Sequence, residues 1–200
     1  MSRKTRSKTA VYKNEAILLI GGAGFLGSHI VDGLMREGYT NVTILDLRRP
    51  LLKEHQNVAF VQADLTDAES LARAFDQTKP AVVMHTASPP HGRPPAFYDS
   101  VNVIGTKSVI SLCVRHGVRR LVYTSSCSVV YNGSDIVNGV ETLPYAENHM
   151  DAYNSTKAQA EVLVLEANSS DLQTVALRPS GIFGYVSTTE SAFFLFGSRA

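Results

Sequence analysis

The chain has little of what marks several common protein classes. Its 200 residues include no tryptophan and only two cysteines, and charged residues make up 18%. Cys113 and Cys127 are too few for a disulfide framework or a cysteine zinc site, which suits a reducing compartment, and we expect both in core segments. No apolar run approaches the ~18 residues of a transmembrane helix. With 44% hydrophobic residues, the sequence instead predicts a globular domain that buries a sizeable core.

Charge of one sign is also scarce, except at the N-terminus. The formal net charge is +1, which argues against a nucleic-acid-binding protein. Residues 1–16 nevertheless carry five basic side chains against Glu15 alone. This start lacks the apolar stretch of a secretory signal, so we interpret residues 1–15 as a basic solvated arm, with a targeting peptide as the alternative.

Short apolar runs alternate with helical patterns along most of the chain. The run at 16–20 is continuously apolar, which is typical of a strand buried on both faces. The segment 128–150 fits neither pattern. The alternation predicts an α/β fold with a Rossmann-type, doubly wound parallel sheet. Strands are expected at 16–20, 41–46, 57–63, 81–87, 119–126 and 173–179, and helices at 25–37, from 66 onward, at 99–116 and at 152–167.

Two of these helices carry more detailed signals. Thr66 followed by Glu69 has the spacing of a capping box, in which each side chain caps the backbone of the other residue. That helix would turn Leu71, Ala74 and Phe75 toward the core. The expected buried face of the first helix is formed by Ile30, Val31, Leu34 and Met35.

A glycine-rich loop joins the first strand to the first helix. Glycine allows a tight turn there and lets backbone N–H groups and the positive helix N-terminus reach a pyrophosphate. No lysine follows at P-loop spacing, which disfavours a nucleoside triphosphate, and the alternative is a glycine turn without a ligand. The cofactor-binding residues predicted in this loop are Gly21, Gly22, Gly24, Phe25, Leu26 and Gly27.

Asp46 stands 19 residues after Gly27, at the end of the second strand. A carboxylate in this place would accept a hydrogen bond from a ribose 2′-OH and repel a 2′-phosphate, so it favours NAD. Arg48 and Arg49 leave NADP open, because an arginine can accept that phosphate. The alternative for both arginines is a solvated turn.

Tyr153 and Lys157 are four residues apart and therefore share one face of the last helix. A free tyrosine has a pKa near ~10 and is a poor base at neutral pH. An ammonium group and a nicotinamide cation beside it would lower that pKa, so that the tyrosine could take the hydroxyl proton of an alcohol during hydride transfer. The alternative is an ordinary pair on a helix face.

Three further polar residues are candidates for the same site. Ser125 and Ser126 follow the fifth strand, where a hydroxyl could hold a substrate oxygen or merely close a local turn. Asn102 is polar within an apolar helix, where it could orient a water relay at a bend or be satisfied within the core. We predict no metal site, because His85 and His91 lack partners at ligand spacing.

Together these motifs resemble the extended short-chain dehydrogenases/reductases over residues 16–184. Within that family, segments such as 85–90 and 143–161 resemble the 3β-hydroxysteroid dehydrogenase branch, and most of all its fungal-type sterol-4α-carboxylate 3-dehydrogenases (decarboxylating). Further motifs in family order are Asp64-Leu65, His85-Thr86-Ala87-Ser88, Asn102 in Asn-Val-x-Gly-Thr, Tyr123-Thr124-Ser125-Ser126 and Arg178-Pro179.

The resemblance implies a role for each matching residue. Tyr153 would be the general base, Lys157 would bind the nicotinamide ribose, and Ser126, or else Ser125, would orient the substrate, with Asn102 completing the catalytic set. The implied reaction oxidises the C3 hydroxyl of a 4α-carboxysterol with NAD, or NADP, to a β-keto acid that loses CO₂. Residues implied to flank the adenine or line the cofactor are Asp64, Leu65, Ala87, Ser88 and Pro179.

The resemblance stops after Gly184. We interpret residues 185–200 as a tail that stands where the substrate subdomain would begin, so that subdomain is incomplete. Three functions stay open: a sterol dehydrogenase, an NAD(P)-binding domain without activity, and a 3β-hydroxysteroid dehydrogenase/isomerase-like or flavonoid-reductase-like enzyme. The resemblance also implies work at the cytoplasmic face of the endoplasmic reticulum, with peripheral membrane association and a homodimer left open.

Overall fold

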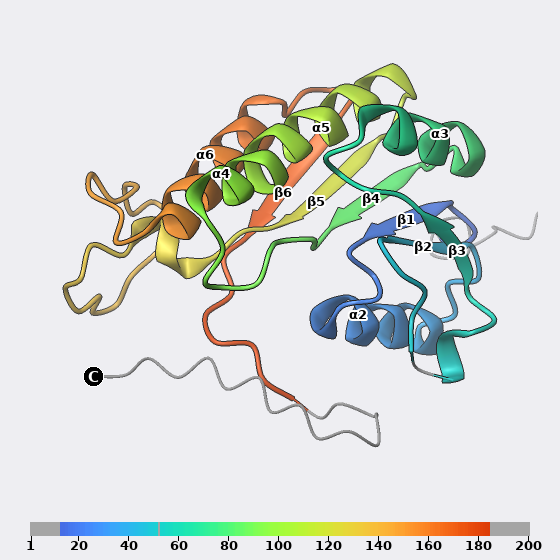
Figure 1. Ribbon diagram of the computed structural model, residues 1–200, viewed down its shortest axis with the longest axis horizontal. Coiled ribbons are helices and arrows are strands. Elements are labelled where there is room, and N and C mark those ends of the chain that lie inside the picture. The colour runs from blue at the N-terminus through green and yellow to red at the C-terminus, as the bar shows by residue number, and fades with distance from the viewer. Residues whose placement is uncertain (1–12, 52, 185–200) are drawn as a thin grey trace, which may run out of the picture.

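Six short apolar segments form one sheet in the order β3-β2-β1-β4-β5-β6 (Figure 1). The computed structural model describes residues 13–51 and 53–184. All neighbouring strands are parallel, which confirms the doubly wound sheet predicted from the sequence. The strands are β1 (Ile17–Ile20), β2 (Val42–Asp46), β3 (Ala59–Gln62), β4 (Val82–His85), β5 (Arg120–Thr124) and β6 (Gln173–Leu177).

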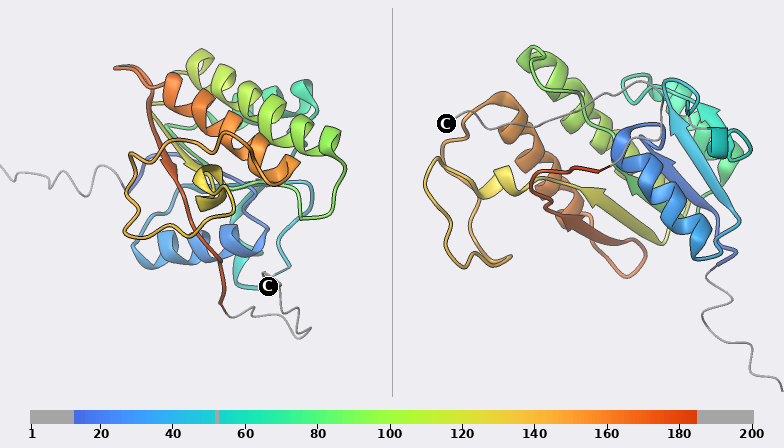
Figure 2. Two further views of the ribbon diagram at one scale, coloured as in Figure 1. Left: turned by 90° about the vertical axis from the view of Figure 1, so that its left-hand side faces the viewer. Right: turned by 90° about the horizontal axis from the view of Figure 1, so that it is seen from below.

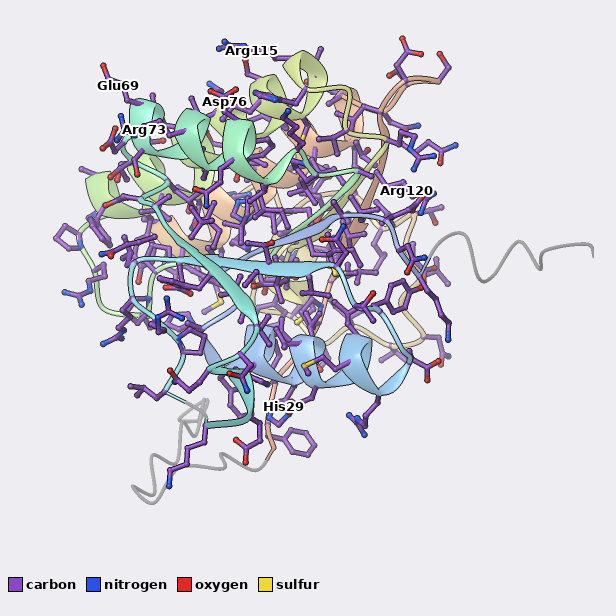
Figure 3. The ribbon with its side chains drawn as sticks, turned by 90° about the vertical axis from the view of Figure 1, so that its right-hand side faces the viewer. His29, Glu69, Arg73, Asp76, Arg115 and Arg120 are labelled. Atoms are coloured by element: carbon purple, nitrogen blue, oxygen red, sulfur yellow. The ribbon has the colours of Figure 1, made fainter. Side chains whose placement is uncertain are left out.

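Helices lie on both faces of the sheet (Figure 1). Figure 3 shows the two layers: His29 on α2 lies on one side of the sheet, and Asp76 on α3 and Arg115 on α5 lie on the other. Figure 2 shows α2 near β1, with β6 well to one side of it. The helices are α2 (Phe25–Arg36), α3 (Ala68–Thr78), α4 (Pro95–Tyr98), α5 (Thr106–Arg115) and α6 (Ala152–Glu166).

The core is built around β1. All four residues of β1 are buried, as its continuous apolar run predicted. Leu18 and Phe75 belong to the larger hydrophobic cluster, between the sheet and the helices α3, α5 and α6. Leu19 and Val31 belong to a smaller cluster between the sheet and α2. The central strand therefore holds the two helical layers together.

Two details of the helix expectations were wrong. The N-cap of α3 is Asp67 rather than Thr66, because the Asp67 carboxylate accepts hydrogen bonds from the backbone N–H groups of Glu69 and Ser70 at 3.0 and 3.1 Å. Met35 is exposed on α2 rather than buried, since the 3.6-residue repeat carries the buried face from Val31 to Leu34.

Cys127 was also placed wrongly in the core. It is exposed, because it begins η3 (Cys127–Val130), a short 3₁₀ turn that leads away from the end of β5. Cys113 is buried as expected. The segment after η3, residues 131–150, consists of turns and bends, in agreement with its irregular sequence.

One helix predicted at 99–116 is divided into three parts. α4 begins earlier, at Pro95, and η2 (Asp99–Gly105), which is π-helical, leads into α5. A π-helical turn is wider than an α-helical one and is frequent at functional sites. Within it, a side chain at Gly105 would come within 3.2 Å of Leu65 Cβ, so η2 packs closely on the end of the β3–α3 connection.

The two terminal expectations fall mostly outside the described residues. Residues 1–12 of the arm and residues 185–200 of the tail lie there. Glu15, which we assigned to the arm, forms ion pairs with Arg119 and Arg120 at the start of β5. The part of the predicted arm at Glu15 is therefore attached to the sheet.

Two glycines of α2 give a matched test of this packing. Gly27→Ala should lower the free energy of unfolding by ~2 kcal/mol or more, because its Cβ would lie 2.2 Å from Gly21 O and 2.6 Å from Gly22 Cα. Gly33→Ala should raise it by up to ~1 kcal/mol, because nothing lies within 4 Å and alanine favours a helix. Urea unfolding measures both; equal effects would contradict the close packing of the loop.

Candidate active site

The glycine-rich loop lies at the carboxyl ends of β1 and β4. Gly21 has φ +82°, a left-handed conformation that favours glycine, and its N–H donates to Leu45 O at 2.8 Å. A Cβ at Gly21 would lie 2.6 Å from the backbone nitrogen of Ala87. Only a glycine therefore fits at this position, and the loop after β4 lies directly against it.

The N-terminus of α2 opens from this loop without a cap. The N-cap residue, Gly24, provides no side-chain hydrogen bond, and the first turn contains no acidic residue. Uncapped N–H groups and the positive end of the helix dipole suit an anion such as a pyrophosphate. Phe25 and Leu26, predicted to contact the cofactor, form the first turn of α2.

Asp46 is tied to the same loop. One carboxylate oxygen accepts from Ala23 N at 3.0 Å, and the other accepts from Leu47 N at 2.8 Å. Each oxygen keeps a further lone pair, so the carboxylate can still accept from a ribose hydroxyl. Arg48 is exposed, and Arg49 lies over the ring of Phe60 at 4.9 Å. Glycine loop and carboxylate thus fit a dinucleotide.

The remaining residues predicted to line the cofactor border the same edge of the sheet. The Asp64 carboxylate accepts from the N–H and hydroxyl of Thr66, so it also closes a local turn. Leu65 is buried and Ala87 is partly buried. Pro179 O accepts from Cys127 N at 2.9 Å, which joins the end of β6 to η3.

Lys157 lies on the inner face of α6 and is only 2% exposed. Its Nζ donates to Thr124 O at 2.5 Å and lies 4.4 Å from the centre of the Tyr123 ring. Burial lowers the pKa of Lys157 to about 7. The ammonium is thus directed at the carboxyl end of β5.

Tyr153 lies one turn before Lys157. Burial raises the pKa of Tyr153, while hydrogen bonding to the hydroxyls of Ser126 and Ser88 acts in the opposite direction. The sequence-based expectation was a pKa lowered by Lys157 and a nicotinamide cation, whereas desolvation is the largest effect on Tyr153 in the structure. The structure does place Ser126 and the β4 loop residue Ser88 beside the phenol.

Asn102 connects three elements from within the π-helical turn. Its Nδ2 donates to Thr156 Oγ1 of α6 at 3.1 Å, and its Oδ1 accepts from the Ser88 hydroxyl at 3.2 Å. The amide is only 1% exposed and satisfied on both sides. It therefore positions Ser88, and through it the surroundings of Tyr153.

Ser125 lies apart from Ser126, although the two are adjacent in sequence. Ser125 is buried, its N–H donates to Leu177 O at 2.7 Å, and its hydroxyl helps to lower the pKa of the Glu161 carboxyl. Successive residues at the end of a strand point to opposite sides. Only Ser126 therefore lies beside Tyr153.

Three neighbours of Tyr153 and Lys157 were not predicted from the sequence. The rings of His91 and Tyr98 lie 4.5 and 5.8 Å from that of Tyr153. Glu161 follows Lys157 by one helical turn and is buried. A charged residue at i+4 from Lys157 was a signal for Glu161, whereas the two ring contacts have no signal in the sequence.

His85 has a structural environment. It is buried, its Nε2 lies 3.1 Å from Thr106 Oγ1, and burial lowers its pKa to about 3, so the ring is neutral. Within residues 13–51 and 53–184, no group of three or more His, Cys, Asp or Glu residues is arranged to bind a metal ion. None of the helices in that part of the chain combines the length and apolarity of a membrane-spanning helix.

Comparison with protein families gives a match over most of the chain. The model of the 3-beta hydroxysteroid dehydrogenase/isomerase family matches residues 18–195. The sterol-4-alpha-carboxylate 3-dehydrogenases (decarboxylating) of Saccharomyces cerevisiae and Homo sapiens are 46% and 42% identical to the chain over 182 and 170 residues. These alignments cover 86% and 83% of this chain, and 52% and 44% of the relatives. The chain spans about half the length of the curated relatives it matches.

Solved structures share the fold. The UDP-glucose 4-epimerase of Thermus thermophilus, in complex with NAD, is 32% identical with a TM-score of 0.70, covering 82% of this chain and 54% of that one. An epimerase from Methanothermobacter thermautotrophicus is 29% identical with a TM-score of 0.74, covering 85% and 52%. The likeness confirms the Rossmann-type fold predicted above.

The burial of Lys157 predicts a pH-dependent stability. Its pKa in the folded chain, about 7, lies below the ordinary 10.5, so the unfolded chain binds more protons between these values and stability rises with pH there. Lys157→Met should therefore raise the free energy of unfolding at pH 6, by ~1 kcal/mol or more, and less at pH 9.

Urea unfolding at both pH values measures this difference. Lys107→Met is the matched control, because Lys107 is exposed on α5, and its stability should stay within ~0.5 kcal/mol of wild type. A gain for Lys157→Met that is larger at pH 9 than at pH 6 would contradict the prediction.

Proposed function

Because the chain belongs to the 3-beta hydroxysteroid dehydrogenase/isomerase family, we propose that it forms the cofactor-binding half of an NAD-dependent sterol dehydrogenase. The proposed reaction oxidises the C3 hydroxyl of a 4α-carboxysterol, as the names of its relatives indicate for them. The observation that carries the proposal is the position of Tyr153 and Lys157. Both lie on α6 near the carboxyl ends of β4 and β5, at the same edge of the sheet as the uncapped glycine loop.

The proposed mechanism assigns one task to each residue. Bound NAD supplies the hydride acceptor. Tyr153 takes the proton of the C3 hydroxyl, and Ser126 beside it orients that hydroxyl by hydrogen bonding. Lys157, as an ammonium ion, favours the phenolate form of Tyr153, while Asn102 holds Ser88 in place next to the phenol.

The loss of CO₂ then needs no further group. Oxidation at C3 gives a β-keto acid, in which the new ketone can accept the electron pair of the breaking C–C bond as an enolate. The enzyme would therefore need only hydride and proton transfer. This simplicity agrees with a site made of hydroxyl, phenol, amide and ammonium groups.

Asp46 supports NAD over NADP as the cofactor. Its carboxylate is fixed by two backbone N–H groups at the end of β2, where the ribose hydroxyls of the adenosine half would lie. A 2′-phosphate would meet this negative charge. Arg48 is exposed nearby and keeps NADP as the second choice.

A second function is an NAD-binding domain without turnover. One observation favours it: Val175 and Leu177 of β6 are 45% and 53% exposed. In the register of β5 and β6 they pair with Val122 and Thr124, which alternate with Leu121 and Tyr123 of the larger cluster, so they lie on the opposite face of the sheet and the described residues leave them exposed. A sterol pocket would need further residues to bury them.

The proposal extends to location and assembly. A sterol substrate resides in membranes, so we propose peripheral association with the endoplasmic reticulum at its cytoplasmic face. A homodimer would use the helical layer, where Ile104 and Val114 are 52% and 65% exposed. Sedimentation of the chain with and without sterol-containing vesicles measures both properties.

Binding and turnover assays separate the two functions. The chain is titrated with NADH and NADPH by calorimetry, and oxidation of a 4α-carboxysterol is followed by NADH absorbance. Binding with turnover supports the dehydrogenase, binding without turnover supports the second function, and no binding of either cofactor contradicts both.

Tyr153→Phe tests the assignment of the base. We expect the rate of oxidation to fall by at least ~100-fold, because the proton acceptor is lost, with the NADH dissociation constant changed less than ~2-fold. The control is Tyr39→Phe, because Tyr39 packs against Ile17 and Val42 at the first residues of β1 and β2, the ends of these strands opposite to the site. Unchanged turnover in Tyr153→Phe would remove Tyr153 from the mechanism.

Asp46→Asn tests the cofactor preference. The change keeps the shape of the side chain and removes its charge, so the ratio of NADPH to NADH dissociation constants should fall by ~10-fold. Calorimetric titration with both cofactors measures the ratio. A ratio that stays the same would show that Asp46 only supports the glycine loop.

A further inference from the structure

The inner face of α6 carries a third titratable group that the proposed mechanism does not use. Glu161 lies one turn beyond Lys157, as Lys157 lies one turn beyond Tyr153, so the three share one face of the helix. Lys157 is 2% exposed and Glu161 is 1% exposed. A carboxylate buried to this extent is costly unless other groups compensate its charge.

Arg178 and Tyr145 hold the Glu161 carboxylate by hydrogen bonds. Its Oε1 accepts from Arg178 Nη2 at 2.7 Å, from Arg178 Nε at 2.9 Å and from the Tyr145 hydroxyl at 3.0 Å. Arg178 follows β6, and Tyr145 belongs to the irregular segment after η3. Arg178 is the largest of the contacts that lower the pKa of Glu161, so the residue is a carboxylate.

Arg178 and Tyr145 bind only one of the two oxygens of the Glu161 carboxylate. Glu161 Oε2 is buried and has no hydrogen bond within the described part of the chain, although the Ser125 hydroxyl is near enough to favour the charged form. All three strong contacts fall on Oε1. Glu161 is therefore held through one oxygen, while its charge stays one helical turn from Lys157 on the same buried face.

Three other titratable groups lie around Lys157, and all three are neutral. From β4, His85 is neutral because burial lowers its pKa to about 3. From β5, Tyr123 faces the ammonium with its ring, and burial raises its pKa, so it stays a phenol. From α6, Tyr153 is also protonated, since burial raises its pKa. The carboxylate that acts on Lys157 is that of Glu161.

We propose that Glu161 is a positioning residue of this site: a buried counter-charge, one helical turn from Lys157, that favours the ammonium form of Lys157 and is itself fixed by Arg178 and Tyr145. Burial pulls Lys157 toward the neutral amine, and Glu161 opposes that pull. The role of the Lys157 ammonium in catalysis rests on the proposed function, whereas the effect of Glu161 on the charge of Lys157 does not. The Tyr145 contact also links this charge to the segment 131–150.

The experiment measures the charge of Lys157 directly. The apo chain is labelled with [¹³Cε]lysine, and the lysine resonances are followed by NMR from pH 5 to 10, since this carbon shifts when the amine loses its proton. Lys157→Arg removes one resonance and so assigns it. Three variants are compared with wild type: Glu161→Gln, Arg178→Gln and Tyr145→Phe.

The variants separate charge from structure. Glu161→Gln should lower the midpoint of Lys157 by about one pH unit, a ~10-fold larger proton dissociation constant, because the counter-charge is gone. Both changes break the ion pair between Glu161 and Arg178, but Arg178→Gln leaves the Glu161 carboxylate without its positive partner. This variant should therefore raise the midpoint of Lys157. Tyr145→Phe removes one hydrogen bond and no charge, and should stay within ~0.3 unit.

Opposite shifts in Glu161→Gln and Arg178→Gln support the proposal. A midpoint that is unchanged in Glu161→Gln, or shifts in the same direction in both variants, overturns it, because loss of structure alone would act alike on the two. If Glu161→Gln does not fold, Arg178→Gln decides, with an upward shift as support and any other result as refutation. Because no cofactor is present, failure here is distinct from failure to bind NADH.

Discussion

The close approach of two backbones at the carboxyl ends of β1 and β4 determines most of this structure. Gly21 leaves no space for a side chain against the backbone of Ala87, and its left-handed conformation turns the chain directly into α2. The strand order reverses between β1 and β4, which is the position where sheets of this type bind nucleotides. The uncapped N-terminus of α2, Asp46 and the loop after β4 all lie at the carboxyl ends of these central strands.

A second constraint is the burial of charge along α6. A helix that packs against a sheet ordinarily buries an apolar face, whereas α6 buries Asn154, Lys157 and Glu161 together with its alanines. The two charged groups have partners on other elements: Lys157 contacts Thr124 on β5, and Glu161 contacts Arg178 after β6 and Tyr145 in the segment after η3. Such an arrangement contributes less stability than an apolar face would, and it fixes the position of a cation.

The architecture follows from local patterns, and that is why the sequence was sufficient for it. The central strand β1 is buried on both faces and appears as a continuous apolar run, the other strands contain shorter apolar stretches, and glycines mark the turns. The errors were also local. Thr66 and Asp67 are both good capping residues, and only the geometry of the turn selects Asp67. Cys127 belongs to an apolar stretch but follows the last residue of β5 by three positions, where the chain leaves the core.

The candidate site was predictable where its residues are neighbours in sequence. Tyr153 and Lys157 share a helix face, and the glycines share one loop. Asn102 was identified as unusual, but its contact with Thr156 joins residues 54 positions apart, and its π-helical turn has no sequence signature. The partners of Glu161 come from two further segments. Long-range pairs of this kind depend on how the elements pack, which one sequence does not reveal.

The two halves of the proposed reaction differ in how completely this part of the chain provides for them. The contacts on the cofactor side, Gly21 against Ala87 and Ala23 with Asp46, lie within β1, β2, β4 and their loops. The substrate side is different, because Val175 and Leu177 leave an apolar strip of β6 exposed. Apolar surface that is exposed to water in this way has a free-energy cost, and α2 does not bury it. In the proposed function, the cofactor side therefore depends on contacts between described residues. The sterol side depends on residues that would bury Val175 and Leu177.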